Sequence, residues 1–114
     1  MINVSKLKLE IFIPETHLAN LRQALQSVGA GKIGNYDSCL AYSRVTGTWR
    51  PLQGSHPYIG TCNEISEAPE IKVEVNIQEE ALQGTLKAIR EVHPYEEPVI
   101  NVIPLYPDKV VENS

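Results

Sequence analysis

Apolar and polar residues alternate along two segments of the chain that are near copies of each other. The apolar positions are Leu7, Leu9, Ile11 and Ile13 in the first segment and Ile71, Val73, Val75 and Ile77 in the second. Because successive side chains of a strand point to opposite faces, each segment is expected to form a strand with one apolar face. A shift of 64 residues places Lys8 on Lys72 and Glu15 on Glu79. The two segments therefore indicate an internal repeat.

Each expected strand is followed at once by a segment with helical periodicity. Apolar residues recur there at three- and four-residue spacing, which predicts one apolar stripe per helix. The stripes are Leu18, Leu21, Leu25 and Val28 in the first copy and Leu82, Leu86, Ile89 and Val92 in the second. Gly29 and Gly31 are expected to end the first helix. Pro94 and Pro98 prevent the second helix from continuing.

Two further strands are expected after the helices, at residues 39–45 and 99–105. The region between the copies, residues 47–69, is rich in Gly, Pro and polar residues and is long for a plain connection, which is typical of functional loops. The order β-α-β-β-α-β predicts an α+β fold of the ferredoxin-like sandwich type, with two helices on one face of a four-stranded antiparallel sheet. An uncovered apolar second face would favour a homo-oligomer, with Trp49 or its loop near the contact.

Composition narrows the class of protein. The chain has 114 residues, which suits a single domain, with a core over about residues 6–106 and a tail at 107–114. A net charge of −4 without a basic patch argues against a nucleic-acid partner. The sequence has neither a long apolar run nor a signal-peptide pattern, so we expect a cytoplasmic protein with no membrane partner. Cys39 and Cys62 are too few for a disulfide scaffold.

The glycines at residues 29–34 match the pattern G-x-G-x-x-G. In dinucleotide-binding proteins such glycines lie between a strand and the helix that follows it, so that the helix N-terminus faces the pyrophosphate. Here the expected order is helix, glycines, strand. The segment is better explained as a turn that ends the helix, and a backbone nest for a small anion remains an alternative.

The densest polar cluster is HPYEEP at residues 93–98, and His56-Pro57-Tyr58 repeats its beginning. A histidine beside two carboxylates is suited to bind a divalent metal or to transfer protons. The alternative is a histidine at a helix C-terminus, followed by a rigid turn. No cofactor is certain. We expect at most a weakly bound divalent metal at His93 and Glu97, since three or four converging ligands are not in view.

Three segments together resemble one known module: GAGKIGNYDSC at 29–39, WRPLQGSHPYIG at 49–60 and HPYEEP at 93–98. They resemble the YqfO-type domain of the Ngg-interacting-factor-like proteins, over about residues 6–106. Trp49 departs from the family pattern, which more often has phenylalanine. The resemblance implies a CutA/PII-like fold and a regulatory or interaction module. Full-length members carry a dinuclear metal site in flanking halves that the resemblance does not reach, so their hydrolase-like assignment does not transfer.

These observations favour a small, non-enzymatic, oligomeric regulatory or interaction domain. Its partners would be other copies of itself and a small molecule or another protein. We expect one ligand pocket where the three segments meet. Its residues would be Gly31, Gly34, Asn35, Tyr36, His56, His93, Tyr95 and Glu97. A metal-dependent hydrolase that uses His56, His93 and Glu97 is the main alternative, and an assembly module without a ligand is the third.

Overall fold

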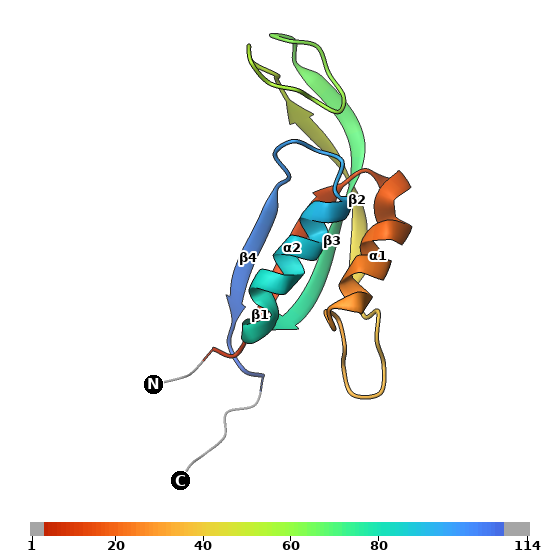
Figure 1. The fold of residues 1–114 in the computed structure, drawn as a ribbon, viewed down its shortest axis with the longest axis vertical. Helices are drawn as coiled ribbons and strands as arrows, with labels where there is room; N and C mark the ends of the chain where they lie inside the picture. The colour runs from red at the N-terminus through yellow and green to blue at the C-terminus, as the bar shows by residue number, and fades with distance from the viewer. Residues whose placement is uncertain (1–3, 109–114) are drawn as a thin grey trace.

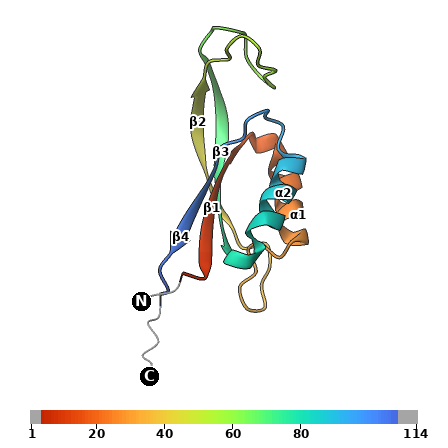
Figure 2. The same ribbon diagram turned by 60° about the vertical axis from the view of Figure 1, so that its left-hand side comes forward.

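The computed structural model describes residues 4–108 and contains a four-stranded antiparallel sheet with two helices on one face (Figures 1 and 2). The strands are β1 (Lys6–Ile13), β2 (Ala41–Trp49), β3 (Ser66–Gln78) and β4 (Ile100–Leu105), in the spatial order β2-β3-β1-β4. The helices are α1 (Leu18–Ser27) and α2 (Leu82–Val92), each preceded by a short 3₁₀ turn, η1 (Glu15–His17) and η2 (Glu79–Ala81). The predicted β-α-β-β-α-β order and the ferredoxin-like fold are confirmed.

The sequence repeat forms the centre of the sheet. Strands β1 and β3 are its equivalent parts, and they pair antiparallel. Glu10 lies directly opposite Glu74, its equivalent 64 residues later. The distance between two equivalent residues therefore increases with their separation from this pair along the strands. Equivalent residues far from the pair lie at opposite ends of the sheet.

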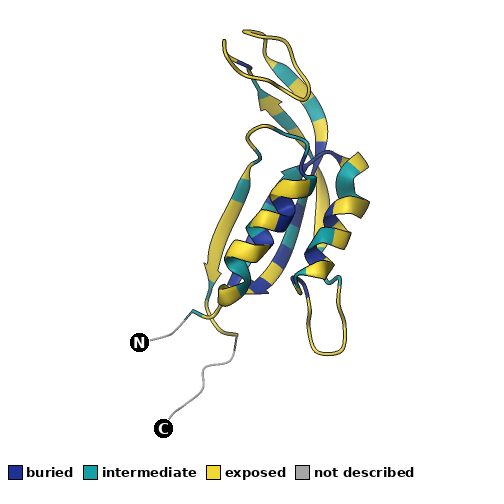
Figure 3. Cartoon of the chain, viewed as in Figure 1, coloured by how far each residue is buried: buried dark blue, intermediate teal, exposed yellow. Residues whose placement is uncertain are grey.

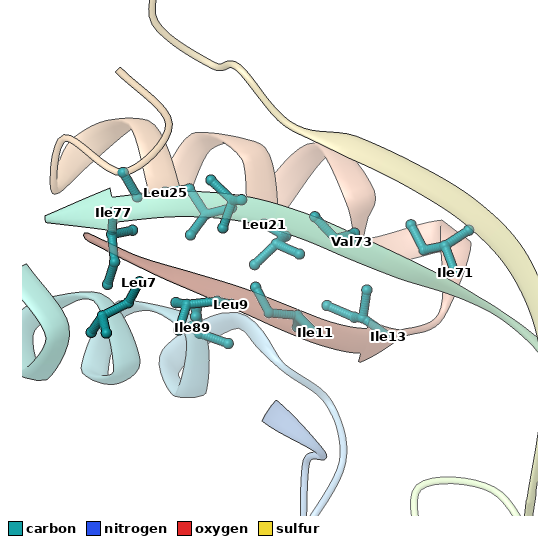
Figure 4. Close-up of a cluster of buried hydrophobic side chains, with 12 residues drawn as sticks. Leu7, Leu9, Ile11, Ile13, Leu21, Leu25, Ile71, Val73, Ile77 and Ile89 are labelled. Carbon is teal, nitrogen blue, oxygen red and sulfur yellow. The ribbon is translucent and has the colours of Figure 1, made fainter. Parts of the chain in front are cut away.

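The core lies between the two central strands and the helices (Figures 3 and 4). The eight apolar residues predicted for the inner faces of β1 and β3 are all at most 6% exposed. On α1, Leu21 and Leu25 are buried as expected. On α2 the buried residues are Thr85, Ala88 and Ile89, which share one helix face at three- and four-residue spacing. The other residues predicted for the α2 stripe, Leu82, Leu86 and Val92, are half-buried. Leu82 and Val92 pack against the core, as Leu18 and Val28 of the α1 stripe do.

The second face of the sheet is polar along its central strands, which corrects the expectation of an apolar face. Lys8 of β1 forms ion pairs with Glu10 of the same strand and with Glu74 of β3. Alternation along β3 puts Lys72 and Asn76 on this face as well. These side chains are half-exposed or exposed.

Strands β2 and β3 continue past the end of β1 as a two-stranded arm. The last β1 residue, Ile13, pairs with Ile71, whereas the β2–β3 pairing continues to Trp49 opposite Ser66. We call residues 45–49 and 66–70, with the loop 50–65 between them, the arm; it projects beyond α1 and β4 (Figure 1). The loop expected at 47–69 is therefore shorter than predicted, since both of its ends belong to strands.

No helix within residues 4–108 is both long enough and apolar enough to cross a membrane. Of the tail predicted at 107–114, residues 109–114 lie outside the described part of the chain.

Candidate functional site

A groove lies where the arm meets residues 93–99, the segment that links α2 to β4. Both parts lie at the same end of the sheet (Figure 1). The groove has a volume of about 570 Å³, and its lining is mostly apolar and aromatic, including Trp49, Pro51, Leu52, Tyr58, Tyr95 and Val99. A hollow of this size, with a few polar groups among apolar walls, is typical of a small-molecule site.

Tyr95 and Glu70 form the polar centre of the groove. The Tyr95 hydroxyl donates a hydrogen bond to Glu70 Oε2 over 2.5 Å. Glu70 lies on β3 at the base of the arm and is only 6% exposed. Burial raises the pKa of Tyr95 well above its ordinary value, and the hydrogen bond and the charge of Glu70 add to the rise. The phenol therefore stays protonated and acts as a donor.

The glycine at position 47 makes room for this carboxylate. Gly47 lies on β2, and its neighbour Val45 pairs with Glu70 across the arm. A Cβ at position 47 would overlap the carboxylate of Glu70. Any larger residue at position 47 would therefore displace the Glu70 carboxylate.

His93 is a structural residue that contacts the groove residues Phe12 and Tyr95. It is 8% exposed, Nε2 lies 2.6 Å from the Phe12 carbonyl, and Nδ1 accepts the backbone N–H of Tyr95 at 3.2 Å. The neutral tautomer with the proton on Nε2 satisfies both contacts. Burial lowers the pKa of His93; the bond to Phe12 and the charge of Glu70 oppose that shift, and His17 adds to it. His93 fixes the turn that presents Tyr95.

Mild acid is expected to destabilise the fold through His93. Because the folded pKa lies below the unfolded value of about 6.5, the unfolded state binds the proton more readily. The stability contributed by neutral His93 is complete above about pH 6.5 and is lost as the pH falls towards the folded pKa. Urea unfolding from about pH 7.5 to 5 should show this fall. His93→Gln should flatten this pH dependence of stability. The matched control is His56→Gln at an exposed histidine, which should leave the pH dependence unchanged. Equal pH slopes in wild type and His93→Gln would contradict this role.

Aromatic rings connect the arm to the segment 93–99. The ring of Tyr95 lies 6.0 Å from the rings of Trp49 and Tyr58, centroid to centroid, and is tilted against both. The Trp49 indole N–H donates to the Ile59 carbonyl at 3.0 Å, which folds the loop 50–65 back over the strands. The backbone N–H of His56 donates to Glu96 Oε1 at 2.8 Å. The loop is thus attached to residues 95 and 96 by tilted aromatic contacts and by a charge-assisted hydrogen bond.

The structure brings two of the three predicted segments together. Residues 54–60 and 93–97 meet at the groove, but the segment with Gly31, Gly34, Asn35 and Tyr36 lies at the opposite end of the sheet (Figure 1). The Gly31 N–H donates to the carbonyl of Asn76, near the end of β3. The prediction that all three segments form one pocket is therefore wrong. The reason is the antiparallel pairing of β1 with β3, which places equivalent helix ends at opposite ends of the sheet.

The glycine segment is a helix-ending turn. Ala30 N–H donates to the Leu25 carbonyl and Gly29 N–H to the Gln26 carbonyl, the two bonds of a Schellman motif. Gly29 and Gly31 have φ of +76° and +79°. A Cβ on Gly31 would lie 2.7 Å from the Cys39 carbonyl oxygen. Since the Gly31 N–H is already bonded to Asn76, the segment is built as a turn.

The expectation of a metal at His93 and Glu97 meets a physical obstacle. Both ring nitrogens of His93 are engaged within the protein, so coordination would require one of these hydrogen bonds to break. Among residues 4–108, no group of three or more His, Cys, Asp and Glu side chains could hold a metal ion. The geometry gives no support to the hydrolase alternative.

Of the predicted site residues, Tyr95 and Glu97 line the groove, whereas His56 and His93 do not. The sequence did not point to Glu70, Gly47 and Phe12, which line it as well. The apolar alternation of β3 assigns Glu70 to the same face as Lys72, where a charge suggests solvent. Its burial depends on Tyr95, 25 residues away in the sequence. No local pattern signals that contact.

Comparison with known proteins shows strong similarity to part of a longer protein. No model of a known protein family matches the sequence. The chain is 40% identical over 98 residues to the "GTP cyclohydrolase 1 type 2 homolog" of Halalkalibacterium halodurans. The matched region covers 86% of this chain and 26% of that protein. A protein of the same name from Bacillus subtilis is 32% identical over 98 residues, with the same coverage. The chain thus spans about a quarter of the length of the curated relatives it matches.

Solved structures confirm the fold. A Bacillus cereus protein related to NIF3 matches with a TM-score of 0.77 and 33% identity, over 92% of this chain and 27% of that one. CutA from Synechococcus elongatus matches with a TM-score of 0.67 and 17% identity, over 93% and 81% of the two chains. GlnK from B. subtilis, a PII protein, matches with a TM-score of 0.61 and 19% identity, over 89% and 85%. The fold is that of CutA and PII proteins.

Proposed function

We propose that this chain is a small oligomeric regulatory or interaction domain that binds a small molecule in the groove between the arm and residues 93–99. The observation that carries the proposal is the Tyr95–Glu70 pair, a buried polar centre in a groove with aromatic walls. Binding sites place a few polar groups among apolar walls to orient a ligand, and the groove has this arrangement. The likeness of the fold to CutA and GlnK supports a domain of regulatory type.

The name of the longer relatives includes a GTP cyclohydrolase, but that activity is not part of this proposal. The similarity covers about a quarter of each relative. Within this chain, the groove carries three carboxylates, those of Glu70, Glu96 and Glu97. A triphosphate would be repelled by them, so we place the function in ligand recognition by the groove.

Equilibrium dialysis against a bacterial small-molecule extract, read by mass spectrometry, tests the proposal. Val99 lines the groove and is 54% exposed, so Val99→Arg should block the groove without disturbing the core. Ile33, 59% exposed and outside the groove lining, gives the matched control Ile33→Arg. We expect wild type and Ile33→Arg to retain a compound that Val99→Arg loses. Equal retention by all three proteins, or retention by none, would contradict a groove ligand.

Self-association is expected to use the exposed edge strand β4. Val102 and Ile103 are exposed on β4, and Tyr106 just beyond it is 77% exposed. An edge strand with unpaired backbone groups and exposed apolar side chains is suited to pair with another chain. Sedimentation at concentrations on the order of tens of micromolar should show an oligomer, and Ile103→Lys should shift it to smaller species. A monomer under these conditions would refute the oligomeric part of the proposal.

A further inference from the structure

We propose that the groove selects an organic cation, a protonated amine or a quaternary ammonium group attached to a small apolar body. The inference rests on the proposed function, since it names the ligand class of the same groove. It is carried by two independent features, a buried carboxylate without a cationic partner in the described part of the chain and three aromatic rings that line the same groove.

Glu70 is a buried acidic side chain whose charge is not neutralised by the protein. It is 6% exposed and lines the groove. Within residues 4–108 it receives one hydrogen bond, from Tyr95, and forms none of the ion pairs. A buried carboxylate is costly unless it is paired, and one neutral donor does not supply the missing charge. A bound cation would supply it.

The neighbouring titratable groups leave this charge unbalanced. His93 lies within reach of the charge of Glu70, but its two hydrogen bonds hold it as the neutral tautomer. Arg50 also lines the groove, but it forms no ion pair in the described part of the chain. Glu96 and Glu97 add two carboxylates to the lining. Three carboxylates against one guanidinium make the groove favourable for cations and unfavourable for phosphates.

Three rings form what we call the aromatic cage: Trp49, Tyr58 and Tyr95. The ring of Tyr95 lies 6.0 Å from each of the other two, and interplanar angles of 44° and 49° leave the ring faces unstacked. The faces of such rings carry negative potential and attract ammonium groups, with tryptophan the strongest. One carboxylate beside an aromatic cage suits an organic ammonium better than a metal ion, which requires several converging oxygen or nitrogen ligands.

Choline and its uncharged isostere 3,3-dimethyl-1-butanol test this inference, because they differ chiefly in charge. Trp49 is the only tryptophan, so its indole N–H gives a single NMR reporter inside the groove. We expect choline to bind at least about tenfold more tightly than the isostere. Glu70→Gln keeps an acceptor for Tyr95 but removes the charge, and should reduce choline affinity to that of the isostere. Tyr58→Leu, at a ring that is 52% exposed, should weaken choline binding without affecting the fold.

Glu67→Gln is the matched control, since Glu67 is an exposed β3 glutamate outside the groove lining. It should leave choline binding at the wild-type level. Equal affinity for choline and the isostere would overturn the cation inference while leaving a groove ligand in place. Binding of neither compound would overturn the cation inference too, and the dialysis experiment would then decide the proposed function separately. Choline binding unchanged in Glu70→Gln would also overturn it.

Discussion

Replacing Leu25 with alanine is expected to lower the free energy of unfolding by about 2–5 kcal/mol, the range for a leucine removed from a packed core. Leu25 is 1% exposed and packs from α1 onto the central strands (Figure 4). Ile89, its equivalent 64 residues later, is fully buried, so Ile89→Ala should cost a comparable amount. Urea or guanidinium unfolding measures both changes.

The exposed α1 residue Gln23 provides the control for this comparison. Gln23→Ala leaves the core untouched and should change stability by no more than about 0.5 kcal/mol. A loss below about 1 kcal/mol in both Leu25→Ala and Ile89→Ala would show that the helices do not share the core described here.

Gly47→Ala should destabilise the protein by about 1–3 kcal/mol and disrupt the groove, although the substitution adds only a methyl group. The added Cβ would overlap the Glu70 carboxylate, which must then move away from Tyr95. A buried carboxylate that loses its donor costs about 1–3 kcal/mol. Tyr95 loses its acceptor at the same time. Chemical unfolding measures the cost, and the Trp49 indole resonance should shift because its ring lies against Tyr95.

Gly84→Ala is the matched control with the opposite expected sign. Gly84 lies in α2, and nothing within 4 Å would meet an added Cβ. Alanine there should stabilise the helix by about 0.5–1 kcal/mol. Equal effects of the two glycine substitutions would contradict the spatial role assigned to Gly47.

The central strands and the order of elements could be predicted because each carries its own signal. Residues 7–13 and 71–77 alternate strictly, since one face is buried and the other solvated. The ends of β2 and β3 in the arm have no such signal. Gly47 and Pro69 lie within paired strands there, and most neighbouring side chains are exposed or half-exposed on both faces. The length of the arm is set by the backbone pairing of β2 with β3, which cannot be predicted from the local sequence.

The candidate site was predictable only where residues close in sequence act together. His93 and Tyr95 are two residues apart, and the turn between them follows from Pro94. Glu70 joins them only in three dimensions, through a hydrogen bond that spans 25 positions. The position of the glycine segment at 29–35 does not follow from the sequence, because the orientation of one repeat relative to the other is set by strand pairing. That pairing sends the ends of α1 and α2 in opposite directions (Figure 2).

A crystal structure of the protein grown in the presence of a bacterial small-molecule extract tests the central claim most directly. We expect electron density for a small molecule between the rings of Trp49, Tyr58 and Tyr95, within reach of the Glu70 carboxylate. Density at residues 29–36 with none in the groove, or a groove filled by the protein's own side chains, would contradict the claim.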